Sequence, residues 1–369
     1  MKLYISHWSA MSCYDIPMLE YFFAQELVAV SETTQTTVYE QRRKKKGQRI
    51  RYCKLSVPEE YLLCDPNSGE HIVAPELAYL QVAHDLPFHR RLLLALLICA
   101  KEPGSNLPAL STRERLRACV TAIPGHRGRR RALQALKYVR DNCNSQSFVE
   151  PILFMFLALP NCLGGMGITD LAFNRRFEFT EEERATFRKS CLYSDFVSEQ
   201  WRLAIEYDSD AYHGRNDSDP KRRSQSDLDV ARATILGARK YEALSLRTPQ
   251  LYKPRQFEMF IREMFRRAGK YIRIRTERFW DMFQEIAALL PRSEAVIPHE
   301  VGSDVRRLMS YERAIEFGRQ RDALARAEMF GGPRRWRLVT QPVGERPAGE
   351  RPAGERPEPN SGADGSNVG

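Results

Sequence analysis

The chain has 369 residues, 43% of them hydrophobic, and a formal net charge of +10. This length and composition suit two or three globular domains and exclude a chain that is disordered throughout. The longest apolar run, residues 92–100, is too short to span a bilayer, so we expect no membrane segment. A basic chain without such a segment favours a polyanionic partner, most often nucleic acid.

The cysteines and the N-terminus indicate a reducing compartment. The eight cysteines lie singly, without a CxxC pair, which excludes the common zinc frameworks. The first residues, MKLYISHWSAMS, lack the apolar core and small-residue cleavage site of a signal peptide. We therefore expect a cytoplasmic protein.

Residues 1–110 predict an α+β region. A short helix follows Ser6, and two strands, 36–41 and 49–57, flank the basic run RRKKKGQ. As a hairpin, these strands would carry the run at their tip, where it could lie along a phosphate backbone like the wing of a winged-helix domain. The alternative is a solvated loop that charge keeps soluble. The cations assigned to DNA contact are Arg42, Arg43, Lys44, Lys45 and Lys46.

A basic connector is expected at 111–146, after a loop rich in Pro, Gly and Ser. Before the loop, residues 71–83 predict a short strand broken by Pro75 and then a helix, and the apolar run 92–100 predicts a buried helix. The connector contains the cluster HRGRRR, in which Arg129 and Arg130 are candidate DNA contacts.

Residues 147–270 predict an α/β fold with a mixed sheet. Its helix 147–159 has Ser147 as a cap and Glu150 as the capping-box partner. The order of elements is α, β, β, β, α, β, α. The strands are expected at 173–179, 191–198, 201–209 and 241–248, and the later helices at 225–239 and 254–267. A polar connection is expected at 180–190.

The last two parts of the chain differ in character. Residues 271–333 read as helical and amphipathic. Residues 334–369 carry the repeat GERPAGERPAGERPE, which has no apolar side chain larger than alanine and predicts a disordered tail.

Acidic residues follow each other on two successive strands of the 147–270 region. Asp195 lies in YSDFVS, and Glu206 and Asp208 lie in AIEYDSDAYH. About ten residues separate Asp195 from Glu206, which is hairpin spacing, so we expect the two carboxylates to lie close together. Such a cluster repels itself unless a cation neutralises it, and hard carboxylate oxygens suit Mg²⁺ or Mn²⁺. The sequence therefore predicts a metal site here.

Two further residues complete this candidate site. Glu150, on the preceding helix, would add an oxygen ligand or orient a water, and His213, in the loop after the third strand, would approach the substrate. The alternative for these acids is a set of solvent-facing carboxylates paired with nearby arginines. Arg222, Arg223 and Arg232 are candidate contacts to neighbouring phosphates.

This arrangement resembles the PD-(D/E)XK nuclease superfamily, whose core is α-β-β-β-α-β. Within it, Asp195-Phe196, Glu206, Asp208 and His213 are similar to the pattern of the endonuclease-like domain related to very-short-patch repair enzymes. The resemblance covers roughly 147–266 and implies a restriction-endonuclease-like core and metal-dependent hydrolysis of DNA. Asp208 stands where the superfamily usually has a lysine, and Ser209 where a glycine usually follows.

A second resemblance covers about the first 100 residues. The segments ISHWSAM and VAPELAYLQVA are similar to the N-terminal part of AbiE-type abortive-infection antitoxins and related transcriptional regulators. It implies an alternative function: a DNA-binding regulator that retains a nuclease-like fold without catalysis. DNA is the expected partner in both cases, and a partner toxin or a homodimer stays open.

Overall fold

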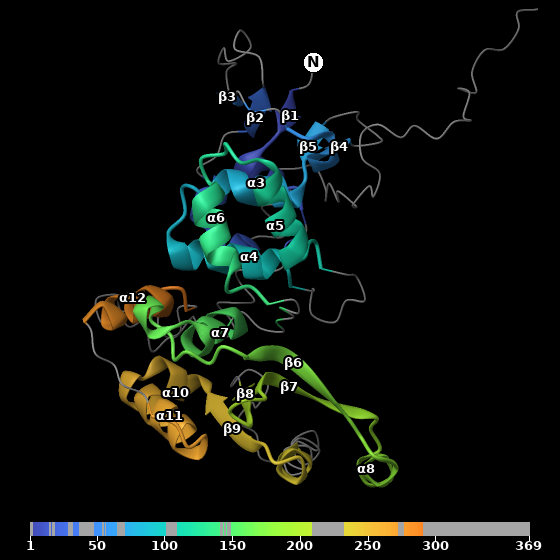
Figure 1. Cartoon of the computed structure of the whole chain (residues 1–369), viewed down its shortest axis with the longest axis vertical. Coiled ribbons are helices and arrows are strands. Elements are labelled where there is room, and N and C mark those ends of the chain that lie inside the picture. Colours follow the sequence, from blue (N-terminus) through green and yellow to red (C-terminus); the bar gives the residue numbers. More distant parts are fainter. Residues whose placement is uncertain are drawn as a thin grey trace, which may run out of the picture.

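A computed structural model of the chain describes residues 3–14, 16, 19–28, 32–36, 48–53, 55, 57–64, 71–100, 109–140, 143, 145, 149–208, 232–271 and 277–290. Within them the protein is a mixed α/β structure with two mixed sheets, one of five strands and one of four (Figure 1). The five-stranded sheet is formed by earlier residues and the four-stranded sheet by later ones. The expected α/β class is therefore confirmed at this level.

The first sheet has two parallel and two antiparallel pairings. Its strands are β1 (Tyr4–Ile5), β2 (Glu32–Thr36), β3 (Gln48–Tyr52), β4 (Leu62–Cys64) and β5 (His71–Val73), in the order β3-β2-β1-β5-β4. β2 and β3 run parallel, with Thr34 opposite Ile50. A tight turn joins only antiparallel strands, and parallel strands need a crossover. The hairpin expected from strands 36–41 and 49–57 is therefore wrong, and residues 37–47 between the observed strands lie outside the described part of the chain.

Helices pack beside this sheet because burying their apolar side chains against it is favourable. They are α1 (His7–Met11), α2 (Leu19–Val28), η2 (Glu59–Tyr61), α3 (Pro75–Val82), α4 (Phe88–Ile98), α5 (Arg113–Ala122) and α6 (Arg129–Leu136). α3 begins at Pro75, the helix position where proline is best tolerated. α4 contains the expected buried helix, and its residues from Leu92 to Ile98 are all buried. A helix that is apolar all round belongs in a core.

The second sheet has the four strands in the predicted order, with one additional helix, α8, between the first two. Its elements are α7 (Glu150–Ala158), η3 (Asn161–Leu163), β6 (Ala172–Glu178), α8 (Glu181–Phe187), β7 (Cys191–Ser198), β8 (Leu203–Asp208), the helical residues 232–238, β9 (Glu242–Arg247), α10 (Thr248–Tyr252), α11 (Pro254–Arg267) and α12 (Glu277–Ala287). The strand order is β6-β7-β8-β9, with β6, β7 and β8 antiparallel in turn and β9 parallel to β8.

Two helices differ from expectation: α8 is an additional helix, and α7 starts at a different residue. The polar connection at 180–190 contains α8, whose start is fixed by a capping box: Thr180 and Glu183 each accept from the other's backbone N–H. α7 begins at Glu150 with Val149 as its N-cap and no side-chain capping bond, so Glu150 is not a capping-box partner. Pro151 in the first turn accounts for this start. Ser147 lies outside the described residues.

Apolar side chains cover both faces of the second sheet. On one face, Phe154 of α7 stacks on Phe173 of β6 with ring centroids 4.6 Å apart, within the main core. On the other face, Val197 and Ala204 lie opposite each other in register and join a smaller cluster with Leu236. Leu236 belongs to the helical residues 232–238, so this short helix covers that face.

A buried histidine connects the two parts of the structure. His89 of α4 has its Nδ1 2.9 Å from Glu285 Oε2 of α12 and its Nε2 3.0 Å from the Leu163 carbonyl oxygen of η3. These bonds tie the helix α12 to the N-terminal helical layer. α12 lies within the expected helical segment 271–333, of which residues 272–276 and 291–333 lie outside the described part of the chain.

All eight cysteines are free thiols. Among the described residues, no helix combines the length and apolar character that crossing a membrane requires. The repeat tail at 334–369 lies outside the described part of the chain.

Candidate functional site

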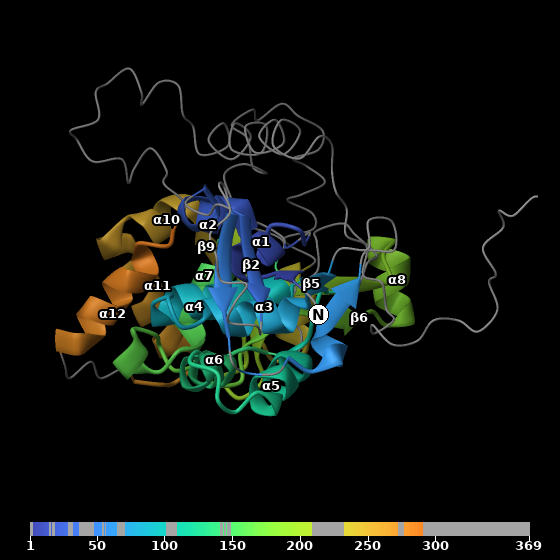
Figure 2. The same cartoon turned by 90° about the horizontal axis from the view of Figure 1, so that it is seen from above.

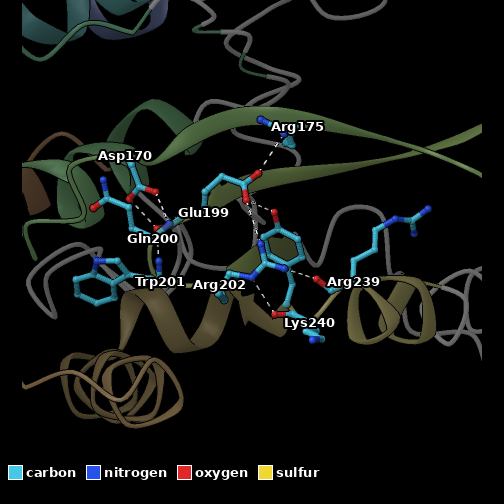
Figure 3. Close-up of polar contacts among 10 residues, drawn as sticks. Asp170, Arg175, Glu199, Gln200, Trp201, Arg202, Arg239 and Lys240 are labelled. Atoms are coloured by element: carbon cyan, nitrogen blue, oxygen red, sulfur yellow. Dashed lines mark hydrogen bonds and ion pairs between the residues drawn. The ribbon is translucent and has the colours of Figure 1, made fainter.

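The turn between β7 and β8 is held by side-chain hydrogen bonds at both of its ends (Figure 3). Asp170 accepts from Ser198 Oγ at 2.7 Å and from the Gln200 backbone N–H at 2.8 Å. After the turn, Arg202 donates from Nε to the Lys240 carbonyl oxygen at 3.2 Å. These bonds fix the turn, and a fixed turn sets the pairing register of the strands it joins.

That register brings two acidic positions together. Phe196 lies opposite Ile205, and Asp195 and Glu206 are the next residues on the two strands. The charge of Asp195 raises the pKa of Glu206, so the two carboxyl groups are neighbours, as hairpin spacing predicts. The backbone pairing ends at Phe196, and beyond it Asp195 Oδ2 accepts the Tyr207 backbone N–H at 2.8 Å. The Asp195 carboxylate therefore replaces a backbone acceptor and is held against β8.

Glu206 is a buried carboxyl group, with 7% of the residue exposed. It lies two residues after Ala204 on β8, and so on the face that the helical residues 232–238 cover. Burial and, next in size, the neighbouring Asp195 raise the pKa of Glu206 to about 7. A hydrogen bond from the Ser194 hydroxyl acts in the opposite direction. Glu206 is therefore close to its titration point at neutral pH.

Asp195 shares this environment. Burial raises its pKa above the ordinary range, while the Tyr207 N–H and Arg232 act to lower it. Two neighbouring carboxyl groups in a buried place disfavour each other's ionised form. A positive charge nearby would therefore lower the free-energy cost of ionising both carboxyl groups.

Arg232 supplies such a charge. Its Nε lies 3.5 Å from Glu206 Oε1, and about a quarter of the arginine side chain is exposed. Among the described residues, Glu206 Oε1 receives no hydrogen bond. Its contact with Arg232 is therefore an ion pair without a hydrogen bond. Arg232, expected to contact a phosphate, is thus placed against the acidic pair.

Asp208 forms the outer edge of the cluster. It follows Glu206 by two residues, is half-buried, and accepts a hydrogen bond from the Ser245 hydroxyl of β9. Its charge raises the pKa of both Asp195 and Glu206, which places it in their electrostatic neighbourhood. The three acids predicted from adjacent strands are therefore brought together.

The remaining predicted site residues stand apart or cannot be placed. Glu150 is buried in the first turn of α7 and is not among the groups that shift the pKa of Asp195 or Glu206. Of the arginines in HRGRRR, Arg130 is exposed and Arg129 is half-buried. The residues outside the described part of the chain are Arg42, Arg43, Lys44, Lys45, Lys46, His213, Arg222 and Arg223.

Two hydroxyl groups were missed by the sequence reasoning. Ser194 bonds Glu206, and Ser245 bonds Asp208. Ser194 directly precedes Asp195, and Ser245 lies opposite Glu206 in the parallel pairing of β8 and β9. Ser194 could have been found from the sequence, because it is adjacent to Asp195. Ser245 could be found only once the pairing of β8 with β9 was known.

The acidic cluster meets part of the requirement for a divalent cation. Among the described residues, no group of three or more His, Cys, Asp or Glu side chains is arranged to hold a metal ion. Mg²⁺, however, is often bound by one or two carboxylates, with water and substrate phosphate filling its other positions. The pair Asp195 and Glu206 fits that smaller requirement, with Arg232 as the competing cation.

No family model, curated protein or solved structure matches the chain.

Proposed function

We propose that the chain is a metal-dependent endonuclease-like protein that hydrolyses phosphodiester bonds in DNA, in phage defence or DNA repair. The observation that carries this proposal is the pair Asp195, half-buried, and Glu206, buried, at the end of the pairing between β7 and β8, where both carboxyl groups have raised pKa values. Stability alone does not favour such a pair, since two buried like charges are costly. A site that binds a cation compensates this cost.

The element order supports a restriction-endonuclease-like core as part of the proposal. It would comprise α7, the antiparallel strands β6, β7 and β8, the helical residues 232–238 and the parallel strand β9. In this core, the acids lie on adjacent central strands, just beyond the last backbone pair of β7 and β8, where the charge of Asp195 acts on Glu206.

Most of the predicted site residues have a defined part in this mechanism. Asp195 and Glu206 would hold Mg²⁺ or Mn²⁺, with Asp208 as a further oxygen donor. Such an ion neutralises charge on the phosphate and activates water for attack. Arg232 would leave Glu206 and turn its guanidinium to the phosphate, which it binds well. His213 would transfer a proton or contact the phosphate, whereas Glu150, which stands apart from the acidic pair, takes no part.

A second candidate is a DNA-binding regulator of the AbiE antitoxin type without catalysis. The ion pair between Arg232 and Glu206 favours it, because an internal cation already neutralises the site. Asp208, in place of a lysine, also favours it. In this case the acidic cluster would be structural, and a toxin or a second copy of the chain would be the partner.

Thermal melting with Mn²⁺ tests the metal site. At pH 8, where both carboxyl groups can ionise, saturating Mn²⁺ should raise the melting temperature of the wild-type protein by several degrees, because the ion binds only the native state. Asp195→Asn and Glu206→Gln should remove most of this shift. Glu258→Gln, an exposed residue of α11, serves as the control and should keep it. Equal shifts in all four proteins, or none, would count against the proposal.

A further inference from the structure

The positive charge of the chain is concentrated in one described segment. Residues 113–140 contain nine arginines and lysines and one acidic residue, Glu114. The segment therefore carries a net charge of +8, whereas the whole chain carries +10. It comprises α5, α6 and the residues that connect and follow them.

The two helices bury their apolar side chains and leave their charges outside. Leu116, Cys119 and Val120 of α5 and Ala135 and Leu136 of α6 are buried in the main core. α5 and α6 lie side by side as an outer layer over α3 and α4 (Figure 1), and both lie at one edge of the structure when it is seen from above (Figure 2). Arg113 Nε also donates to the Leu136 carbonyl oxygen at 3.3 Å, which joins the two helices.

Part of the positive charge is committed to the structure. Arg115 pairs with buried Glu76 at 3.3 Å, and Arg131 donates to the His84 carbonyl oxygen. Arg113 and Arg140 likewise donate to backbone carbonyl oxygens. Among the other cations of the segment, four are exposed and have no ion-pair partner among the described residues. They are Arg117, Arg127, Arg130 and Lys137.

One histidine beside this segment senses its positive charge. Burial lowers the pKa of His84, and Arg127 and Arg131 lower it further.

We propose that the outer surface of α5 and α6 binds the phosphate backbone of double-stranded nucleic acid. Exposed arginines and lysines without acidic partners are the groups that contact phosphates. Arg130 and Lys137 lie two helical turns apart, about 10 Å along the axis, which matches the rise of roughly three phosphates along one strand of a duplex.

The composition of this surface favours a duplex over other polyanions. The large exposed hydrophobic residues of the described chain are Leu3, Tyr193, Met259, Tyr271 and Trp280, and none lies on α5 or α6. A helix that binds a membrane surface inserts apolar side chains, and a single-strand site stacks bases on aromatic rings. This surface offers neither, so it should bind duplexes without sequence preference. The proposal does not require a functional carboxylate site.

Duplex binding in EDTA tests this surface separately from any cleavage. The probe is a DNA duplex of about 20 base pairs, titrated at several salt concentrations. The double variant Arg127→Gln with Arg130→Gln should weaken binding roughly ten-fold and reduce the salt slope by nearly 2, since each phosphate contact contributes about 0.9. The variant Arg117→Gln with Lys137→Gln should act similarly.

A matched control removes the same charge elsewhere. Arg262 and Arg266 are exposed on α11, and their replacement by glutamine should leave the salt slope unchanged. Equal losses in the control and test variants would show a general charge effect and overturn the proposal. An unchanged slope in both folded test variants would overturn it as well. So would a loss of binding to anionic phosphatidylserine vesicles without any loss of duplex binding.

Discussion

Glu206→Gln should make the protein more stable at high pH and leave it nearly unchanged at low pH. Burial and Asp195 raise the pKa of Glu206 from 4.5 to about 7. Below pH 4.5 the carboxyl group is protonated in both the folded and unfolded states, so it makes no difference to stability. As the pH rises from 4.5 to 7, the unfolded state releases the proton that the folded state retains, and the wild-type protein loses stability. Above pH 7 the full loss remains.

The glutamine variant lacks this loss because it carries no ionisable group at that position. The difference between the unfolded and folded pKa of Glu206 corresponds to about 3 kcal/mol of stability above pH 7, or a rise in melting temperature of roughly 5–10 °C. Melting curves at pH 4, 5, 6, 7 and 8 measure it, in metal-free buffer. Glu258→Gln, on the exposed surface of α11, should show little dependence on pH over this range. A stability gain for Glu206→Gln that is the same at pH 4 and pH 8 would contradict the assignment of the raised pKa.

Gly164→Ala should destabilise the protein by about 3 kcal/mol or more. Gly164 has a φ of 82°, in the left-handed region that side chains disfavour. A Cβ atom there would lie 2.5 Å from the backbone carbon of Met282 and the backbone nitrogen of Phe283, both in α12. Because backbone atoms cannot rotate away, α12 must move outward. Denaturant unfolding gives the size of the effect, and hydrogen exchange of the α12 amides shows its location.

Gly167→Ala separates the cost of backbone strain at a positive φ from the cost of the steric clash with α12. Gly167 has nearly the same φ, 81°, but its Cβ would meet nothing within 4 Å. Its replacement should cost only the backbone strain, about 1 kcal/mol. If both variants lost the same stability, the close approach between Gly164 and α12 would not contribute.

The second sheet could be predicted from the sequence because its signals are local. Strand β7 has the expected bounds, 191–198, and β8 and β9 differ from expectation by only one or two residues at their ends. Hairpin spacing alone was then enough to predict that Asp195 lies close to Glu206. The helix α8 was missed although Thr180 and Glu183 form a capping box that the sequence displays.

The first sheet could not be predicted because its pairing depends on distant segments. β1 pairs with β5 and β2 pairs in parallel with β3, an order that no alternation of apolar residues specifies. The pairing of Arg232 with Glu206 has the same origin. These residues are distant in sequence, and they meet only because the helical residues 232–238 cover the face of the sheet that carries Glu206.

Cleavage of supercoiled plasmid DNA is the most direct measurement of the proposed activity. At pH 8, the wild-type protein should convert the plasmid to its nicked form in Mg²⁺ or Mn²⁺ and leave it intact in EDTA. Asp195→Asn and Glu206→Gln should be slower by roughly 100-fold or more, because each removes a charge that holds the cation. Both variants should still bind a duplex in EDTA as the wild-type protein does. A wild-type protein that nicks in neither metal, or an Asp195→Asn variant that nicks as fast as the wild type, would contradict the proposal that these carboxylates form a nuclease site.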